Sequence, residues 1–168
     1  MRFTATAEGF IDIGGRKVRC ALGKGGVKPA ADKREGDGAS PAGVWPIRRV
    51  LYRPGRGAAP ITAFDLAPIS RHDGWCDDPR DPAYNKPVYL PYPASAEHLW
   101  LEESGVYDVV VILGHNDDPV VPDMGSAIFL HLSQPDYSPT AGCVAIPRAE
   151  MDALLRLARP GDAVEIVA

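Results

Sequence analysis

Cysteine is scarce in this chain, which holds only Cys20, Cys76 and Cys143. An odd number of cysteines cannot form a complete disulfide framework, and three thiols are too few for a structural zinc site by themselves. Clusters of basic residues are also missing, and 18 Lys and Arg against 22 Asp and Glu give a net charge of −4. This balance argues against a nucleic-acid or anionic-membrane surface, so no nucleic-acid partner is expected.

Long hydrophobic runs are absent as well. The longest apolar stretch, around residues 109–113, is far too short to cross a bilayer, and residues 1–8 lack the apolar core of a secretory signal. We therefore expect no membrane span and no export signal at this end of the chain. The apolar share of 45% and the charged share of 24% are close to globular averages. With no repeat or linker, residues 1–168 are expected to form a single domain.

Glycine and proline, by contrast, are abundant, at 17 residues each. A helix bundle cannot carry so many residues that interrupt helices, whereas short strands joined by shaped loops can. Gly14–Gly15 predicts a hairpin turn, and the stretch 109–113, apolar on both faces, predicts a central strand. Pro46 favours an edge or a bulge in its own strand. The expected strands are residues 10–13, 17–22, 44–52, 106–113, 126–132 and 163–167.

One helix is predicted, over residues 148–159. Apolar residues recur from Met151 to Ala158 at the spacing of a helical stripe, and Pro160–Gly161 stops the pattern. Cys20 alternates with polar neighbours on the apolar face of its strand, so we expect it to be a small core residue. No role is assigned to Cys76. The fold expected from the residues is mainly β, with one helix near the C-terminus.

A long proline-rich segment, residues 61–93, shows no regular pattern. Segments of this length inside a compact domain are usually functional or disordered, and its aromatic and proline content favours an ordered wall or lid. It carries Arg71, which could pair with a substrate carboxylate. It also carries Trp75 and Tyr84, which could stack on sugar rings or peptide, although aromatic side chains in ordered loops more often pack locally.

The most informative residues for chemistry are His131 and Cys143. His131 closes an apolar strand, and Cys143 follows Gly142 at the start of a short β segment. A thiol nucleophile needs a nearby base and backbone N–H groups aimed at the developing oxyanion, and a glycine before the thiol permits that approach. From spacing alone, the pair is as well explained by a buried core cysteine and a structural histidine as by a catalytic thiol and its base.

Two sequence blocks resemble the L,D-transpeptidase catalytic domain, the YkuD-like family. His131 followed by Thr140-Ala141-Gly142-Cys143 is similar to the family's strand histidine and its [Ser/Thr]-x-Gly-Cys loop. Ser40-Pro41-Ala42-Gly43-Val44-Trp45-Pro46-Ile47 is similar to an early Thr-Pro-x-Gly-x-[Phe/Tyr]-x-Ile segment. The resemblance spans roughly residues 17–167, and it implies a β-sandwich or barrel of the L,D-transpeptidase type with one C-terminal helix.

The resemblance also implies a mechanism. Cys143 would attack a carbonyl of a peptidoglycan stem peptide to form a thioester, and His131 would move the protons. The N–H groups of Gly142 and Cys143, flanked by Thr140 and Ala141, would form the oxyanion hole. An amine of a second stem would then complete a cross-link. Peptidoglycan stems and glycan strands are the expected partners, a carbapenem is an expected inhibitor, and neither a metal nor an organic cofactor is implied.

The chain departs from the family pattern at Ala141, where many members have His, and at Ala145, where they have Arg or Asn. These differences predict a variant subgroup with altered substrate choice, making 3-3 or 1-3 cross-links. Hydrolysis of the same stems, by a carboxypeptidase or endopeptidase activity, is an alternative, as is a non-catalytic peptidoglycan-binding module. A monomer in the periplasm or cell envelope is expected on substrate grounds, with the cytoplasm as the alternative.

Further candidates lie outside these blocks. His115 and Asn116 follow the central strand directly, a favoured place for substrate contacts, although a plain Asn/Asp turn explains them equally well. His72, Cys76 and Asp77 lack a second ligand pair at a recognised spacing, so no metal site is predicted. Glu97 and His98 fall in a polar stretch that we expect at the surface.

Overall fold

The protein is described by a computed structural model that covers residues 1–168. It is mainly β with one α-helix, as the sequence predicts. The elements in chain order are β1 (Arg2–Thr6), β2 (Phe10–Ile13), β3 (Arg16–Arg19), β4 (Val27–Pro29), the 3-10 helix η1 (Ala30–Asp32), β5 (Ser40–Tyr52), β6 (Leu66–Pro68), β7 (Asp73–Cys76), β8 (Pro87–Tyr89), β9 (Ala96–His98), β10 (Val109–Leu113), β11 (Phe129–Leu132), β12 (Val144–Ile146), α1 (Arg148–Leu157) and β13 (Ala163–Val167).

The long strand β5 organises the main sheet. Its first half pairs with β4 and β13, and its second half pairs with β10 and β6. Opposite β10 the register shifts, because Ile112 pairs with Arg49 while Leu113 pairs with Ile47. Arg48 is therefore the extra residue of a β-bulge two positions after Pro46, in agreement with the irregularity that this proline predicts.

The main sheet is nearly closed into a barrel. Its strands follow the order β12-β11-β10-β5-β13-β1-β2-β3. Directly after β3, Ala21 forms an antiparallel bridge with Ala145 of β12, and Gly23 forms a parallel bridge with Thr140. The two ends of the strand order thus meet at the segment that precedes and contains β12. The expected L,D-transpeptidase-like barrel is confirmed in this form.

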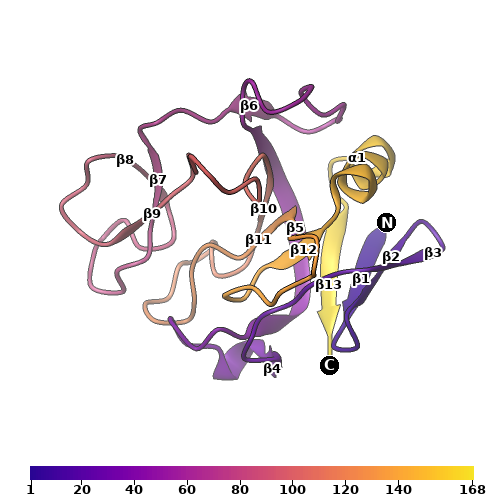
Figure 1. Ribbon diagram of the computed structural model, residues 1–168. Coiled ribbons are helices and arrows are strands. Elements are labelled where there is room, and N and C mark those ends of the chain that lie inside the picture. The colour runs from indigo at the N-terminus through magenta and orange to yellow at the C-terminus, as the bar shows by residue number, and fades with distance from the viewer.

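Two hydrophobic cores lie on opposite faces of β10. Val109, Val111 and Leu113 belong to a core of 22 buried residues, which also contains the buried stripe of α1. Val110 and Ile112 belong to a second core of eight buried residues. Figure 1 shows α1 and β1–β3 on one side of β5 and β10, with β7–β9 on the other. Strand β10 is therefore buried on both faces, as its uniformly apolar sequence predicts.

The proline-rich segment differs from its expected irregular form. It contributes β6 to the main sheet, and together with residues 96–98 it builds a separate three-stranded sheet in the order β8-β7-β9. Strands of three or four residues are too short to show a readable alternation, which is why the sequence pattern misses them. The small sheet (β7–β9) covers the second core and forms the ordered wall that the segment predicts.

Smaller differences concern element ends. The helix ends at Leu157 instead of Arg159. Arg159 precedes Pro160, and a residue before proline disfavours the helical conformation; Ala158 before it is already extended. The strands expected over 106–113 and 126–132 begin three residues later, and the second hairpin strand covers only residues 16–19. Cys20 is buried in the larger core, as expected. None of the helices has the length and apolarity needed to cross a membrane.

Candidate active site

His131 and Cys143 open into the same cleft. The parallel strands β11 and β12 place His131 beside Ala145, and Cys143 immediately precedes β12. The Cys143 Sγ accepts a hydrogen bond from the Phe129 N–H at 3.3 Å. Phe129 lies two residues before His131 on the same strand. Both side chains line a cleft of about 570 Å³. The fold therefore brings together the thiol and the imidazole that the sequence singles out.

The imidazole of His131 is held in one orientation. Its Nδ1 lies 2.9 Å from the backbone carbonyl oxygen of Leu132, and because a carbonyl oxygen only accepts, Nδ1 carries the proton. The ring of Tyr107 packs edge-on against the imidazole, with centroids 5.2 Å apart. Nε2 is then the basic nitrogen. A backbone carbonyl takes the orienting role that an aspartate has in a catalytic triad.

Burial keeps both reactive groups uncharged at neutral pH. Cys143 and His131 are each only 7% exposed. Burial, together with the nearby Glu97 carboxylate, raises the pKa of the Cys143 thiol to about 12. Burial lowers the pKa of His131 to about 4, although its bond to Leu132 opposes the change. In its resting state the site therefore holds a thiol and a neutral imidazole, with the thiol donating to the carbonyl oxygen of Ala127 at 3.2 Å.

The loop that carries Cys143 is closed by the hydroxyl of Thr140. This hydroxyl donates to the Cys143 carbonyl oxygen at 2.7 Å and accepts the Gly142 N–H at 3.1 Å. The Gly142 N–H is thus engaged, whereas the Cys143 N–H has no acceptor in the protein. Gly142 has φ of +138°, and a Cβ on it would lie 2.8 Å from the Ala39 carbonyl oxygen, so only glycine fits here.

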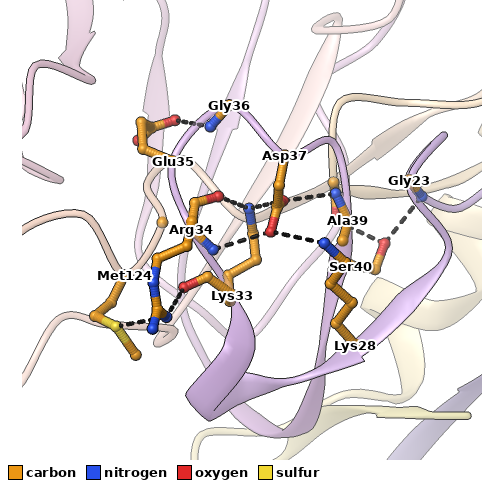
Figure 2. A network of polar contacts seen from close by, with 12 residues as sticks. Gly23, Lys28, Lys33, Arg34, Glu35, Gly36, Asp37, Ala39, Ser40 and Met124 are labelled. Carbon is orange, nitrogen blue, oxygen red and sulfur yellow. Dashed lines mark hydrogen bonds and ion pairs between the residues drawn. The ribbon is translucent and has the colours of Figure 1, made fainter.

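One rim of the cleft is the loop of residues 33–39, of which Glu35, Gly36 and Gly38 line the cavity. Figure 2 shows how this loop is tied: the Lys33 ammonium lies 2.6 Å from Asp37, whose carboxylate also accepts the Arg34 and Ala39 N–H groups. Burial disfavours the Asp37 carboxylate, but these donors outweigh burial and lower its pKa to about 2. The loop is therefore a fixed rim.

The cleft also contains acidic residues that the sequence patterns do not reveal. Glu35, Asp77 and Glu97 line it. Glu97 accepts a hydrogen bond from the Tyr107 hydroxyl, and burial raises its pKa. The surface position expected for Glu97 is thus wrong, because the small sheet turns this side chain into the cleft. Its neighbour His98 is exposed, as expected.

Thr140 and Ala141 line the cleft beside Cys143, whereas His115 and Asn116 lie elsewhere. The latter two line a separate hollow of about 290 Å³. The His115 ring packs edge-on against Trp45, and the Asn116 amide closes its own loop by bonds to Val121 and Gly125. The turn explanation of these residues accounts for their contacts.

The structure does not bring Arg71, Trp75 or Tyr84 to the cleft either. Arg71 is exposed and pairs with Glu102. The Trp75 ring packs edge-on against Phe129, and the Tyr84 hydroxyl donates to Glu35 at 2.8 Å. Trp75 therefore packs within the wall, and Tyr84 holds the rim through Glu35. Both contacts agree with the local packing that is common for aromatic side chains in ordered loops.

Asn85, on the same wall, supports the site without lining it. The only sequence signal for this role is the residue type, because asparagine tolerates the left-handed αL conformation. It has φ of +55° and is 5% exposed. Its Nδ2 donates to the carbonyl oxygens of His115 and Asn116, and its Oδ1 accepts from Trp75 Nε1 and from the Ala127 N–H. Asn85 thus fixes Ala127, whose carbonyl oxygen accepts the hydrogen bond from the Cys143 thiol.

No group of three or more His, Cys, Asp or Glu side chains is arranged to hold a metal ion. All three cysteines are free. The site itself combines a buried thiol, an oriented imidazole and a free backbone N–H, which together suit acyl transfer through a thioester.

The match to a protein-family model agrees with this geometry. No curated protein and no solved structure gives a significant match to the chain. A family model described as the L,D-transpeptidase catalytic domain, YkuD, matches residues 10–166. This match covers nearly the whole chain, including both blocks that carry the resemblance and both reactive side chains. The chain belongs to the YkuD family of L,D-transpeptidase catalytic domains.

Proposed function

We propose that this protein is a cysteine L,D-transpeptidase that cross-links peptidoglycan stem peptides. The observation that carries the proposal is the shared cleft, in which the Cys143 thiol and an imidazole with a free Nε2 face one cavity. Membership of the YkuD family gives the substrate class, and it points to the cell envelope as the place of action.

In the first half-reaction, the Cys143 sulfur attacks a carbonyl carbon of the donor stem while the thiol proton passes to His131 Nε2. The C–N bond then breaks, and His131 returns this proton to the departing amine, which leaves a thioester on Cys143. In the second half-reaction, the amine of an acceptor stem attacks the thioester and gives its proton to His131. Collapse releases the cross-linked product, and the proton returns to the Cys143 sulfur.

The pKa directions favour proton transfer during attack over a preformed ion pair. A thiol with raised pKa and an imidazole with lowered pKa stay neutral together, because both charged forms are poorly solvated in the buried site. Charge then develops only in the transition state, where the Cys143 N–H can bind the oxyanion. One such donor contributes about 10²- to 10³-fold in rate.

The donor bond is proposed to differ from that of the common family pattern. Ala141 and Ala145 both line the cleft, and neither side chain can donate a hydrogen bond to a stem carboxylate. We therefore propose a variant donor choice, with 1-3 links beside or in place of 3-3 links. Muropeptide products that contain only 3-3 dimers would contradict this part of the proposal.

Incubation with purified muropeptides tests the function. We expect cross-linked dimers from the native protein and none from Cys143→Ala or His131→Ala. Cys20→Ala is the matched control, because it removes a buried thiol outside the cleft and should leave dimer formation unchanged. Trimmed monomers without dimers would show hydrolysis instead of transfer, and no change in any muropeptide would indicate a non-catalytic binding module.

A further inference from the structure

The buried hydroxyl of Ser40, at the start of β5, contacts the nucleophile loop directly. Its Oγ accepts the Gly23 N–H at 2.9 Å and donates to the Gly142 carbonyl oxygen at 2.8 Å. Since an N–H can only donate, the bond from Gly23 forces the hydroxyl proton of Ser40 toward Gly142. Ser40 is fully buried, so no water competes for either bond. Figure 2 shows Ser40 beside Gly23, next to the fixed rim of the cleft.

The bond to Gly142 also determines where the Cys143 N–H points. In a trans peptide the carbonyl of one residue and the N–H of the next lie in one plane and point in opposite directions. When Ser40 holds the Gly142 carbonyl, it therefore turns the Cys143 N–H away from the buried side. This N–H is the one that lacks an acceptor in the protein, and Cys143 lines the cleft.

The rest of the loop leaves this peptide plane dependent on Ser40. Thr140 holds the N–H of Gly142 and the carbonyl of Cys143, which are the groups on either side of the peptide but not the peptide itself. Gly142 has no side chain that could restrict its rotation, and glycine has the widest choice of backbone angles. Ser40 is the side chain that fixes the 142–143 peptide.

We propose that Ser40, which bonds Gly142 across 102 residues of the chain, is a positioning residue that aims the Cys143 N–H at the oxyanion. It acts through the Gly142 carbonyl and does not touch substrate. This inference rests on the proposed acyl-transfer function, because an oxyanion forms only when the thiol attacks a carbonyl.

Two reactions of the same thiol separate this role from a general structural one. Acylation of Cys143 by a carbapenem passes through an oxyanion, whereas alkylation by iodoacetamide displaces iodide and forms none. For Ser40→Ala we expect the acylation rate constant, followed by intact-protein mass, to fall about 10- to 100-fold, somewhat less than removal of an oxyanion donor. The alkylation rate of Cys143, followed by peptide mass, should stay within about twofold, because no oxyanion donor is involved.

A second pair of variants isolates the hydroxyl from bulk. Ser40→Thr and Ser40→Val add nearly the same volume, but only Thr keeps the hydroxyl. Thr should retain the acylation rate that Val loses. Thr4→Val is a control, since it removes a hydroxyl that bonds Glu165 on β13, away from the cleft. Both of its rates should match the native protein.

Each outcome decides the question. Equal acylation by Ser40→Ala and the native protein would overturn the inference while leaving the proposed function intact. A parallel fall in acylation and alkylation, or loss of folded protein in both variants without the hydroxyl, would show a structural role only. Absence of any acyl adduct on the native protein would instead refute the proposed function.

Discussion

Replacement of Asn85 by alanine tests whether the small sheet is fastened to the barrel in the way the hydrogen bonds indicate. The substitution removes four bonds of 2.7–3.0 Å in one step: two to the carbonyl oxygens of His115 and Asn116, one from Trp75 and one from the Ala127 N–H. Asn85 is 5% exposed, so water cannot replace these partners without a rearrangement of the wall.

The expected loss of stability follows from the donors left behind. Asn85→Ala leaves the indole N–H of Trp75 and the backbone N–H of Ala127 without acceptors, at about 1–3 kcal/mol each. Alanine at a φ of +55° adds strain of about 1 kcal/mol. We therefore expect the free energy of unfolding to fall by about 3–7 kcal/mol, a large share of the roughly 5–15 kcal/mol typical of a domain.

Urea unfolding followed by far-UV circular dichroism measures this change. Asn85→Gly is the matched variant, because it loses the same four bonds but removes the backbone strain; it should recover about 1 kcal/mol relative to alanine. Asn85→Asp should be destabilised as well, since a carboxylate would face the two carbonyl oxygens that now accept from Nδ2. A loss below about 0.5 kcal/mol for Asn85→Ala would refute the reasoning, because that is the range of a neutral surface substitution.

Three further predictions concern the nucleophile itself. Because burial places the pKa of Cys143 at about 12 and that of His131 at about 4, the thiolate fraction and the iodoacetamide rate should rise about tenfold per pH unit from pH 6 to 9; a plateau there would indicate a preformed ion pair. Glu97→Gln removes a charge that raises the pKa of Cys143, so alkylation at pH 8 should be faster by about three- to tenfold, and an unchanged rate would exclude this coupling. Gly142→Ala should lower the rate of carbapenem acylation more than about 100-fold, because the alanine Cβ would meet a backbone oxygen. Gly15→Ala is the control and should leave this rate unchanged, since Gly15 also has a positive φ but lies in open space. Retained acylation in Gly142→Ala would contradict the loop geometry.

Local patterns in the sequence predict much of the barrel. The helix stripe, the doubly apolar strand β10 and the final strand β13 each carry a signal within a few residues, because each buries an apolar face that the spacing reveals. The nucleophile and its base are found through two short blocks, whose residue types are constrained by chemistry and by the close backbone approach at Gly142.

The remaining features depend on contacts between distant parts of the chain. The small sheet forms from strands of three or four residues, and Glu97 enters the cleft only because β9 pairs with β7. Ser40 meets Gly142 across 102 residues, and nothing in the local pattern of either position indicates a partner. Arg71, Trp75 and Tyr84 lie outside the cleft, since a position on the proline-rich segment is not by itself a position in the cleft.

The most direct measurement is the intact mass of the protein during a single turnover with a carbapenem, followed by digestion to locate the adduct. We expect the mass to increase by one acyl group on the peptide that contains Cys143. The increase should be absent in Cys143→Ala, strongly slowed in His131→Ala and unaffected in Cys76→Ala, whose thiol is buried outside the cleft. A native protein that gains no mass, or that gains it on a residue other than Cys143, would contradict the assignment of this thiol as the nucleophile.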